Sequence, residues 1–169
     1  MNLHILYIED DHSIATLNLE LTAKDHPDSS IKHADTFHKA VSLLEELGPF
    51  DLIVSDFRFP GIDTLSDTGG VDFYRHATAE TPQTPFVILS NSSDVVDSIK
   101  NLPEYALCPP TAIFIKSRIS LSEIIEKAIR GSLATTQDFK VPTLPARPVL
   151  KEKPHTSKLA WGWFLRKDA

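Results

Sequence analysis

A small set of residues in the first two thirds of the chain has side chains suited to chemistry at a shared site. They are the acidic run Glu9, Asp10 and Asp11, followed by Asp56, Ser90 and Lys116. Carboxylate oxygens favour a hard cation such as Mg²⁺, which keeps several of its waters, and a lysine can pair with an anion bound beside that ion. A carboxylate can also act as a nucleophile that accepts a transferred group. These residue types together indicate phosphoryl chemistry at Asp56.

Apolar runs that predict β-strands lead into each of these residues. The runs lie at 3–8, 31–34, 51–56, 85–90 and 112–116. They are short and rich in β-branched or aromatic residues, as strands are. Because several of them are continuously apolar rather than alternating, both faces of the strands are expected to be buried.

Helical spacing of apolar residues between the strands predicts five helices. The first spans 13–24, with Ile14, Leu17 and Leu21 as its core-facing stripe and Asp11 placed to cap it. The others are expected around 37–44, over 71–77, around 95–99 after the cap candidates Ser92 and Ser93, and over 121–129 after a capping box at Ser120 and Glu123. Residues 103–111 are expected to be a loop. Strands alternating with helices predict an α/β fold, a doubly wound five-stranded parallel sheet with helices on both faces. Ligands bind at the carboxyl ends of the strands in such a sheet, which is where the reactive residues stand.

The motifs resemble the receiver (CheY-like) domain of bacterial two-component response regulators. The resemblance rests on Ile8-Glu9-Asp10-Asp11, the strand 51–56 with Pro60-Gly61 after it, the strand 87–90, and Phe114-Ile115-Lys116. All four elements occur in order, each at the end of a predicted strand, and the match covers about residues 2–131. It implies a flavodoxin-like sheet with strand order 2-1-3-4-5.

The resemblance also implies a role for each residue. Asp56 would take a phosphoryl group from the phosphohistidine of a sensor histidine kinase or phosphotransfer protein. Mg²⁺ would be held by Glu9, Asp10, Asp56 and the backbone carbonyl of Arg58, whose side chain is expected to reach into solvent. Ser90 would donate a hydrogen bond to the phosphoryl group, and Lys116 would pair with it. The chain would then be a phosphoacceptor that catalyses its own phosphotransfer and dephosphorylation rather than an enzyme. It would signal to an unidentified downstream protein by contact, with no DNA-binding output domain.

Several positions depart from the family pattern. Ser117 stands where a proline usually forms a cis peptide, and a cis bond before another residue costs ~3–4 kcal/mol, so the Lys116–Ser117 bond is predicted to be trans. Ile113 replaces a frequent switching aromatic, Asn91 replaces a small residue, and 62–69 is an insertion. These departures support an alternative, a pseudo-receiver that binds a protein constitutively without phosphorylation. A phosphatase with an aspartate nucleophile of the haloacid-dehalogenase type is not supported, because Arg58 stands where that family has its second aspartate.

Charge and composition divide the chain into a body and a tail. Residues 1–133 carry 20 acidic against 10 basic side chains, whereas residues 134–169 carry three against seven. A body this acidic would repel nucleic-acid phosphates, so no nucleic-acid partner is expected. There is no apolar run of the ~18 residues that a membrane span needs, and a membrane role is not expected. The single cysteine, Cys108, and the absence of a signal-like start predict a cytoplasmic protein.

The tail itself has two predicted parts. Residues 134–158 hold four prolines and no periodic apolar pattern, which is typical of an extended linker, so the receiver domain is placed at 1–133. Residues 159–169 contain both tryptophans of the chain, beside Phe164, Leu165 and two basic residues. Such a cluster predicts docking onto an acidic protein surface, either the chain's own body or that of a homodimer partner.

Overall fold

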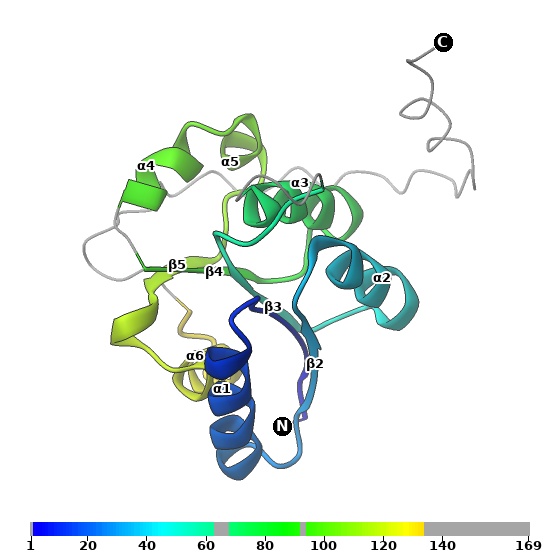
Figure 1. Cartoon of the computed structure of the whole chain (residues 1–169), viewed down its shortest axis with the longest axis vertical. Helices are drawn as coiled ribbons and strands as arrows, with labels where there is room; N and C mark the ends of the chain where they lie inside the picture. The colour runs from blue at the N-terminus through cyan, green and yellow to red at the C-terminus, as the bar shows by residue number, and fades with distance from the viewer. Residues whose placement is uncertain (1, 63–67, 92–93, 134–169) are drawn as a thin grey trace.

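The structure is a computed structural model, and it describes residues 2–62, 68–91 and 94–133. Its five strands form one parallel sheet in the order β2-β1-β3-β4-β5, which confirms the predicted fold (Figure 1). The strands are β1 (His4–Ile8), β2 (Ser30–Ala34), β3 (Leu52–Asp56), β4 (Phe86–Ser90) and β5 (Ala112–Ile115). The helices are α1 (His12–Asp25), α2 (Phe37–Leu47), α3 (Gly69–Glu80), α4 (Asp94–Lys100), α5 (Pro103–Leu107), the short 3-10 helix η1 (Lys116–Arg118) and α6 (Leu121–Ile129).

Helices cover both faces of the sheet, and each face has its own apolar core. The core shared with α1 and α6 contains Tyr7 and Leu52 from the strands. The opposite core, which α2 to α5 cover, contains Leu6 and Ile53. Every residue of β3 and β4 is buried, as the continuous apolar runs predicted for strands covered on two sides.

Two of the predicted helix caps, at α1 and α6, are confirmed. The Asp11 side chain accepts hydrogen bonds from the backbone N–H groups of Ser13 and Ile14 at 2.9 and 3.1 Å, which fixes the start of α1. At α6, Ser120 and Glu123 form the reciprocal capping box. Both helices begin at the end of the sheet where β1 and β5 terminate, so the caps also fix the loops that carry site residues.

The core-facing stripe predicted for the first helix is wrong. Leu17 and Leu21 are 58% and 43% exposed, and the buried residues of α1 are instead Ala15 and Thr22. The ring of Tyr7 and the apolar residues of α6 already fill the core beneath α1. The helix therefore approaches that core mainly through Ala15, Thr22 and the partly buried Leu19, whereas Leu17 and Leu21 face solvent.

The loop predicted over 103–111 is wrong in part, because residues 103–107 form the extra helix α5. Pro103 starts it, a position where proline is tolerated because the first-turn N–H has no helical partner. The helix predicted over 71–77 is also longer, spanning Gly69–Glu80. The cap candidates Ser92 and Ser93, part of the 62–69 insertion and all of 134–169 lie outside the described residues. Within the described ranges, no helix combines the length and apolar character needed to cross a membrane.

Candidate functional site

The sheet register brings the predicted site residues to one edge. Ile8 pairs with Ser55, Asp56 pairs with Leu89, and Ser90 pairs with Ile115, so the residues that end or follow β1, β3, β4 and β5 are neighbours. The carboxylates of Glu9, Asp10 and Asp56 each offer an oxygen, and these three oxygens lie within 4.8 Å of one another. Glu9 and Asp56 are buried, and Asp10 is exposed at the mouth of the group.

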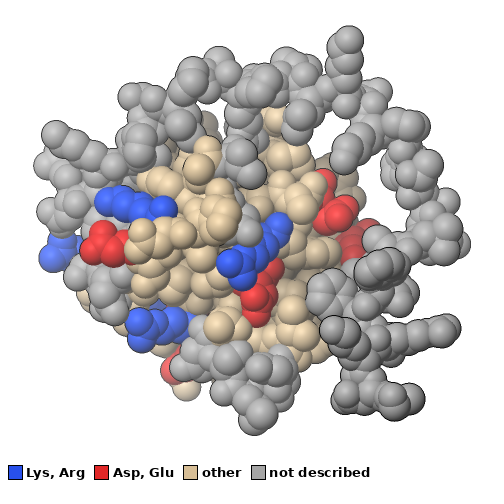
Figure 2. All heavy atoms as spheres, turned by 90° about the horizontal axis from the view of Figure 1, so that it is seen from above, with Lys and Arg blue, Asp and Glu red and all other residues tan. Residues whose placement is uncertain are grey.

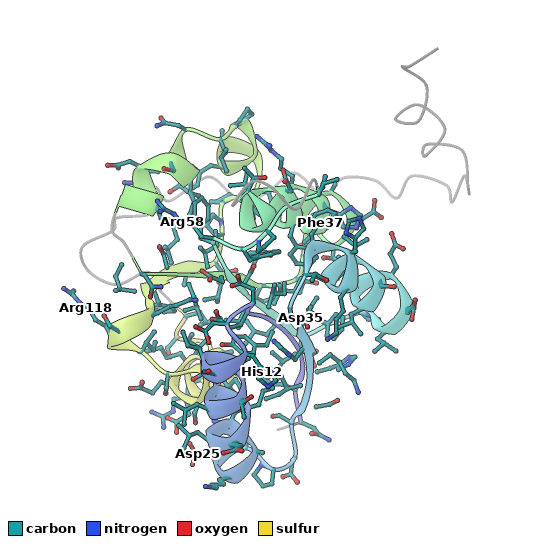
Figure 3. The ribbon with its side chains drawn as sticks, viewed as in Figure 1. His12, Asp25, Asp35, Phe37, Arg58 and Arg118 are labelled. Carbon is teal, nitrogen blue, oxygen red and sulfur yellow. The ribbon has the colours of Figure 1, made fainter. Side chains whose placement is uncertain are left out.

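Lys116 is the cation that faces this acidic group. Its Nζ lies 2.7 Å from Oδ2 of Asp56 and 2.7 Å from Oε2 of Glu9. Burial by itself would lower the pKa of Lys116, but its hydrogen bonds to Asp56 and Glu9 outweigh this, and the pKa is raised. Lys116 therefore stays protonated and holds two buried carboxylates together. Arg118, the other basic residue of η1, extends outward from the body (Figure 3), so Lys116 is the one that enters the site.

Glu9 and Asp10, which lie between β1 and α1, resist ionisation more than an ordinary carboxylate does. Burial raises the pKa of Glu9, and hydrogen bonding to Lys116 offsets only part of the shift. Burial likewise raises the pKa of Asp10, with a smaller contribution from the nearby charge of Asp56. A bound divalent cation would relieve both costs, because it neutralises the crowded carboxylates.

The segment after Asp56 is held in place by close packing with α3. The backbone N–H of Arg58 donates to Oδ1 of Asp56 at 3.2 Å, and the Arg58 side chain is exposed, as predicted. Gly69 donates its N–H to the carbonyl of Phe59 at 2.9 Å. A Cβ on Gly70 would lie 2.1 Å from the carbonyl oxygen of Phe57, so the helix start and this segment are in direct backbone contact.

The end of β4 and the segment after β5 complete the site. Ser90 is 2% exposed, and the following Asn91 is exposed and lines a cavity of about 290 Å³ together with Glu9 and Lys116. Among the described residues the one cis peptide bond joins Gly48 and Pro49, so the Lys116–Ser117 bond is trans, as predicted. The surface seen in Figure 2 mixes Lys and Arg with Asp and Glu in its described part, so no single charge dominates that side of the molecule.

Three further residues contact Glu9 or its neighbour and were not singled out from the sequence. The Tyr7 hydroxyl lies 3.4 Å from Oε2 of Glu9 and accepts a hydrogen bond from Nδ2 of Asn18 at 2.8 Å. Nε2 of His33 lies 2.9 Å from the backbone carbonyl oxygen of Glu9. The spacing of Tyr7 and Glu9 was a usable signal, since residues two apart in an extended segment point to the same side. The contacts of Asn18 and His33 depend on how α1 and β2 pack beside β1, and no spacing in the sequence indicates them.

Neither a search of protein-family models nor a search of curated proteins finds a match. Solved structures do match. The chemotaxis response regulator CheY4 of Vibrio cholerae is 19% identical with a TM-score of 0.56, over 79% of this chain and 100% of that chain. The isolated receiver domain of RcsB from Salmonella enterica serovar Typhimurium, solved with the phosphomimetic BeF3-, is 12% identical with a TM-score of 0.62, over 81% and 95%. A chain described as an adenylate cyclase from Rhodopirellula baltica is 19% identical with a TM-score of 0.60, over 78% and 88%.

These likenesses show the fold. The described residues have the flavodoxin-like architecture of response-regulator receiver domains, with a parallel sheet in the order 2-1-3-4-5 and helices on both faces. The acidic group, with Lys116 across it, stands at the carboxyl edge of that sheet, where doubly wound proteins bind ligands.

Proposed function

We propose that this chain is a phosphorylation-controlled signalling receiver, in which Asp56 accepts a phosphoryl group from a sensor histidine kinase or a phosphotransfer protein. The observation that carries the proposal is the set of three carboxylates with oxygens within 4.8 Å and a lysine 2.7 Å from two of them. An acidic group alone is common on protein surfaces. A buried acceptor carboxylate paired with a partly buried lysine suits the binding of a cation and of an anionic phosphoryl group side by side.

The donor set fits Mg²⁺, because it consists of oxygen atoms grouped around one point at an edge of the sheet. Glu9, Asp10 and Asp56 would hold the ion with the backbone carbonyl of Arg58. Bound there, Mg²⁺ would neutralise the negative charge that gathers as the phosphoryl group approaches a carboxylate. The same role explains why the protein keeps two acids with raised pKa values next to an acceptor.

The chain's own residues would carry the rest of the transfer. A carboxylate oxygen of Asp56 forms the new bond to phosphorus as the bond from phosphorus to the donor imidazole nitrogen breaks, and that nitrogen keeps the electron pair. Lys116 shifts its pairing to the phosphoryl oxygens, and Ser90 donates a hydrogen bond to them. The added ~1.5–2 negative charges favour one arrangement of the Ser90 loop over another, which a partner protein reads.

The proposed output is contact with a downstream protein, with no nucleic-acid partner and no substrate of its own. The likeness to a chain described as an adenylate cyclase is no argument for cyclase activity here, because at 19% identity it shows only a shared fold. A cytoplasmic location belongs to the proposal, since a single cysteine suits a reducing compartment.

A pseudo-receiver is the second candidate, and specific residues favour it. Ile113 is 1% exposed in β5, where many receivers have a switching aromatic, and Ser117 and Asn91 depart from the usual pattern beside the site. In that case Lys116 would hold Asp56 and Glu9 permanently, and the body would bind its partner without phosphorylation.

Phosphate incorporation separates the two candidates. The full chain is incubated with acetyl phosphate, with and without Mg²⁺, and its intact mass is measured. We expect a single phosphoryl adduct that requires Mg²⁺ and disappears in Asp56→Asn. The matched control is Asp35→Asn, which removes an exposed aspartate just after β2 and should leave the adduct unchanged. A wild-type chain that takes up no phosphate would favour the pseudo-receiver.

A further inference from the structure

We propose that Tyr7, supported by Asn18 of α1, is a positioning residue that holds the Glu9 carboxylate in place for the metal ion. The inference rests on the proposed function and assigns a role to residues outside the receiver motifs. It arises from a hydrogen-bonded chain that runs from α1 through the buried ring of Tyr7 to the acidic group.

The direction of the hydrogen bonds follows from counting protons. Nδ2 of Asn18 donates to the Tyr7 hydroxyl oxygen at 2.8 Å, so the single hydroxyl proton is available for another acceptor. Oε2 of Glu9 lies 3.4 Å away and accepts it. Tyr7 is 0% exposed, so bulk water does not compete for the hydroxyl proton. The Tyr7 hydroxyl is therefore a hydrogen-bond donor directed at one oxygen of the buried Glu9 carboxylate.

A second observation separates this role from ordinary core packing. Tyr105, on α5, is also buried, and its hydroxyl has no hydrogen-bond partner among the described residues. Within the described part of the chain, the fold thus tolerates a buried tyrosine whose hydroxyl has no such partner, so burial by itself does not account for the placement of Tyr7 beside a carboxylate and an amide. The polar chain continues to Asn18, which lines the same cavity as Glu9 and Lys116.

The contact gains importance when Lys116 turns to another anion. In the structure, Lys116 bonds both oxygens of Glu9, at 3.0 and 2.7 Å. A phosphoryl group on Asp56 would draw Lys116 toward itself. The donors then left to Glu9 are the Tyr7 hydroxyl and the backbone N–H of Asp11, each at 3.4 Å. Tyr7 would hold the long Glu9 side chain in one rotamer as the lysine leaves.

The test is a Mg²⁺ titration of the full chain by calorimetry. We expect Tyr7→Phe to weaken Mg²⁺ binding roughly three- to tenfold, the range of an ordinary protein hydrogen bond, because the 3.4 Å contact is a long one. Tyr105→Phe, which removes a buried hydroxyl that has no hydrogen-bond partner among the described residues, should leave the affinity unchanged. In a Glu9→Gln background, Tyr7→Phe should cause no further loss, because its effect passes through the Glu9 carboxylate. Asn18→Ala, which keeps the tyrosine ring in place, should weaken binding in the same direction and covers the case that Tyr7→Phe folds poorly.

Each result decides something. If the wild-type chain binds no Mg²⁺, the proposed function fails and the role of Tyr7 fails with it. If the wild type binds and both Tyr7→Phe and Asn18→Ala match it, the positioning role alone is overturned. If Tyr7→Phe weakens binding equally with and without the Glu9 carboxylate, Tyr7 acts through the general packing of β1, which also overturns it. Beryllofluoride binding in the presence of Mg²⁺ gives an independent readout. We expect Tyr7→Phe to lose more affinity for beryllofluoride than it loses for Mg²⁺ alone.

Discussion

At the scale of single residues, the charge balance of the site depends on Lys116. The site places two buried carboxylates against one ammonium group, which is 10% exposed. Removing one partner of a buried ion pair leaves an uncompensated charge, a change that costs several kcal/mol. The lysine is therefore a structural necessity for the resting protein as well as a candidate partner of the phosphoryl group.

A Lys116→Met variant should show this dependence directly. We expect the metal-free variant to lose about 3 kcal/mol of unfolding free energy in urea denaturation. Mg²⁺ should restore part of the loss, since it supplies positive charge to the same carboxylates. Lys39→Met is the matched control, because Lys39 pairs with Asp35 on the surface at 46% exposure, and its loss should stay below about 1 kcal/mol. Equal losses for the two variants would contradict the buried pairing.

Titration of Lys116 gives a prediction with a definite sign. Its pKa in the folded chain is raised above the ordinary 10.5 by Asp56 and Glu9, against the opposing effect of burial. A lysine with a raised folded pKa contributes stability fully below its unfolded pKa, and this stability is lost as the pH rises through the folded value. The unfolding free energy of the wild type should therefore fall above about pH 10.5, and that of Lys116→Met should fall less. Denaturation curves from pH 8 upward measure the difference. Glu9 acts in a separate, acidic range of pH, because burial raises its pKa above the ordinary 4.5. The contribution of Glu9 to the unfolding free energy is therefore lost as the pH rises from 4.5 through the raised pKa of the folded chain.

At the scale of elements, the start of α3 positions the segment that follows Asp56. Gly70 faces the backbone of Phe57, and an added Cβ would lie 2.1 Å from its carbonyl oxygen. Neither partner in this contact is a flexible side chain, so the backbone itself would have to move. The glycine therefore allows a helix to begin directly against the segment that carries Arg58.

Gly70→Ala should accordingly damage both the fold and the site. We expect a loss of about 2 kcal/mol or more in unfolding free energy, as for other overpacked sites, together with weaker Mg²⁺ binding. Gly131→Ala is the comparison, because Gly131 has a φ of 63° and nothing within 4 Å of an added Cβ. Its cost should be the ~1–2 kcal/mol of a left-handed backbone position, with Mg²⁺ binding intact. An unchanged Mg²⁺ affinity in Gly70→Ala would show that the helix start does not control the site.

The accuracy of the sequence predictions differs between elements for physical reasons. The five strands were placed within a residue or so because their apolar runs are short and sharply bounded. The face of α1 was predicted wrongly, since spacing identifies an apolar stripe but not whether the core beneath has room for it. The short helix α5 was missed because a proline was read as a break, whereas Pro103 marks a helix start.

At the scale of the whole molecule, the site could be predicted because a parallel sheet gathers its strand ends. Glu9, Asp56 and Lys116 are far apart in the chain, yet each was expected at the carboxyl edge from its position after a strand. The geometry places them within bonding distance. The contact from Asn18 to Tyr7 could not be predicted, because it depends on how α1 rotates above β1.

The described chain ends beside the core that α1 covers, and α1 also carries two exposed leucines, Leu17 and Leu21. Leu133, at the end of the described chain, packs against the core that α1 and α6 cover, as does Leu19 of α1. Residues 134–158 could span up to about 75 Å at ~3.1 Å per residue, which is ample reach back to α1. The body, with 20 acidic and 10 basic residues, would attract a tail with seven basic and three acidic ones. We therefore expect residues 159–169, which lie outside the described residues, to dock on the patch formed by Leu17 and Leu21.

Tryptophan fluorescence tests this docking without any label, because Trp161 and Trp163 are the only tryptophans of the chain. Burial of their rings against α1 should shift the emission of the full chain to shorter wavelength than that of the free peptide 155–169. Replacing Leu17 and Leu21 together by serine should remove the shift, since it removes the apolar surface that the rings cover. Leu47→Ser is the matched control, a leucine at the end of α2 with 40% exposure. A shift that grows with protein concentration would place the tail on a second copy instead. Peptide-like emission in the wild type would contradict docking of the aromatic cluster on this chain.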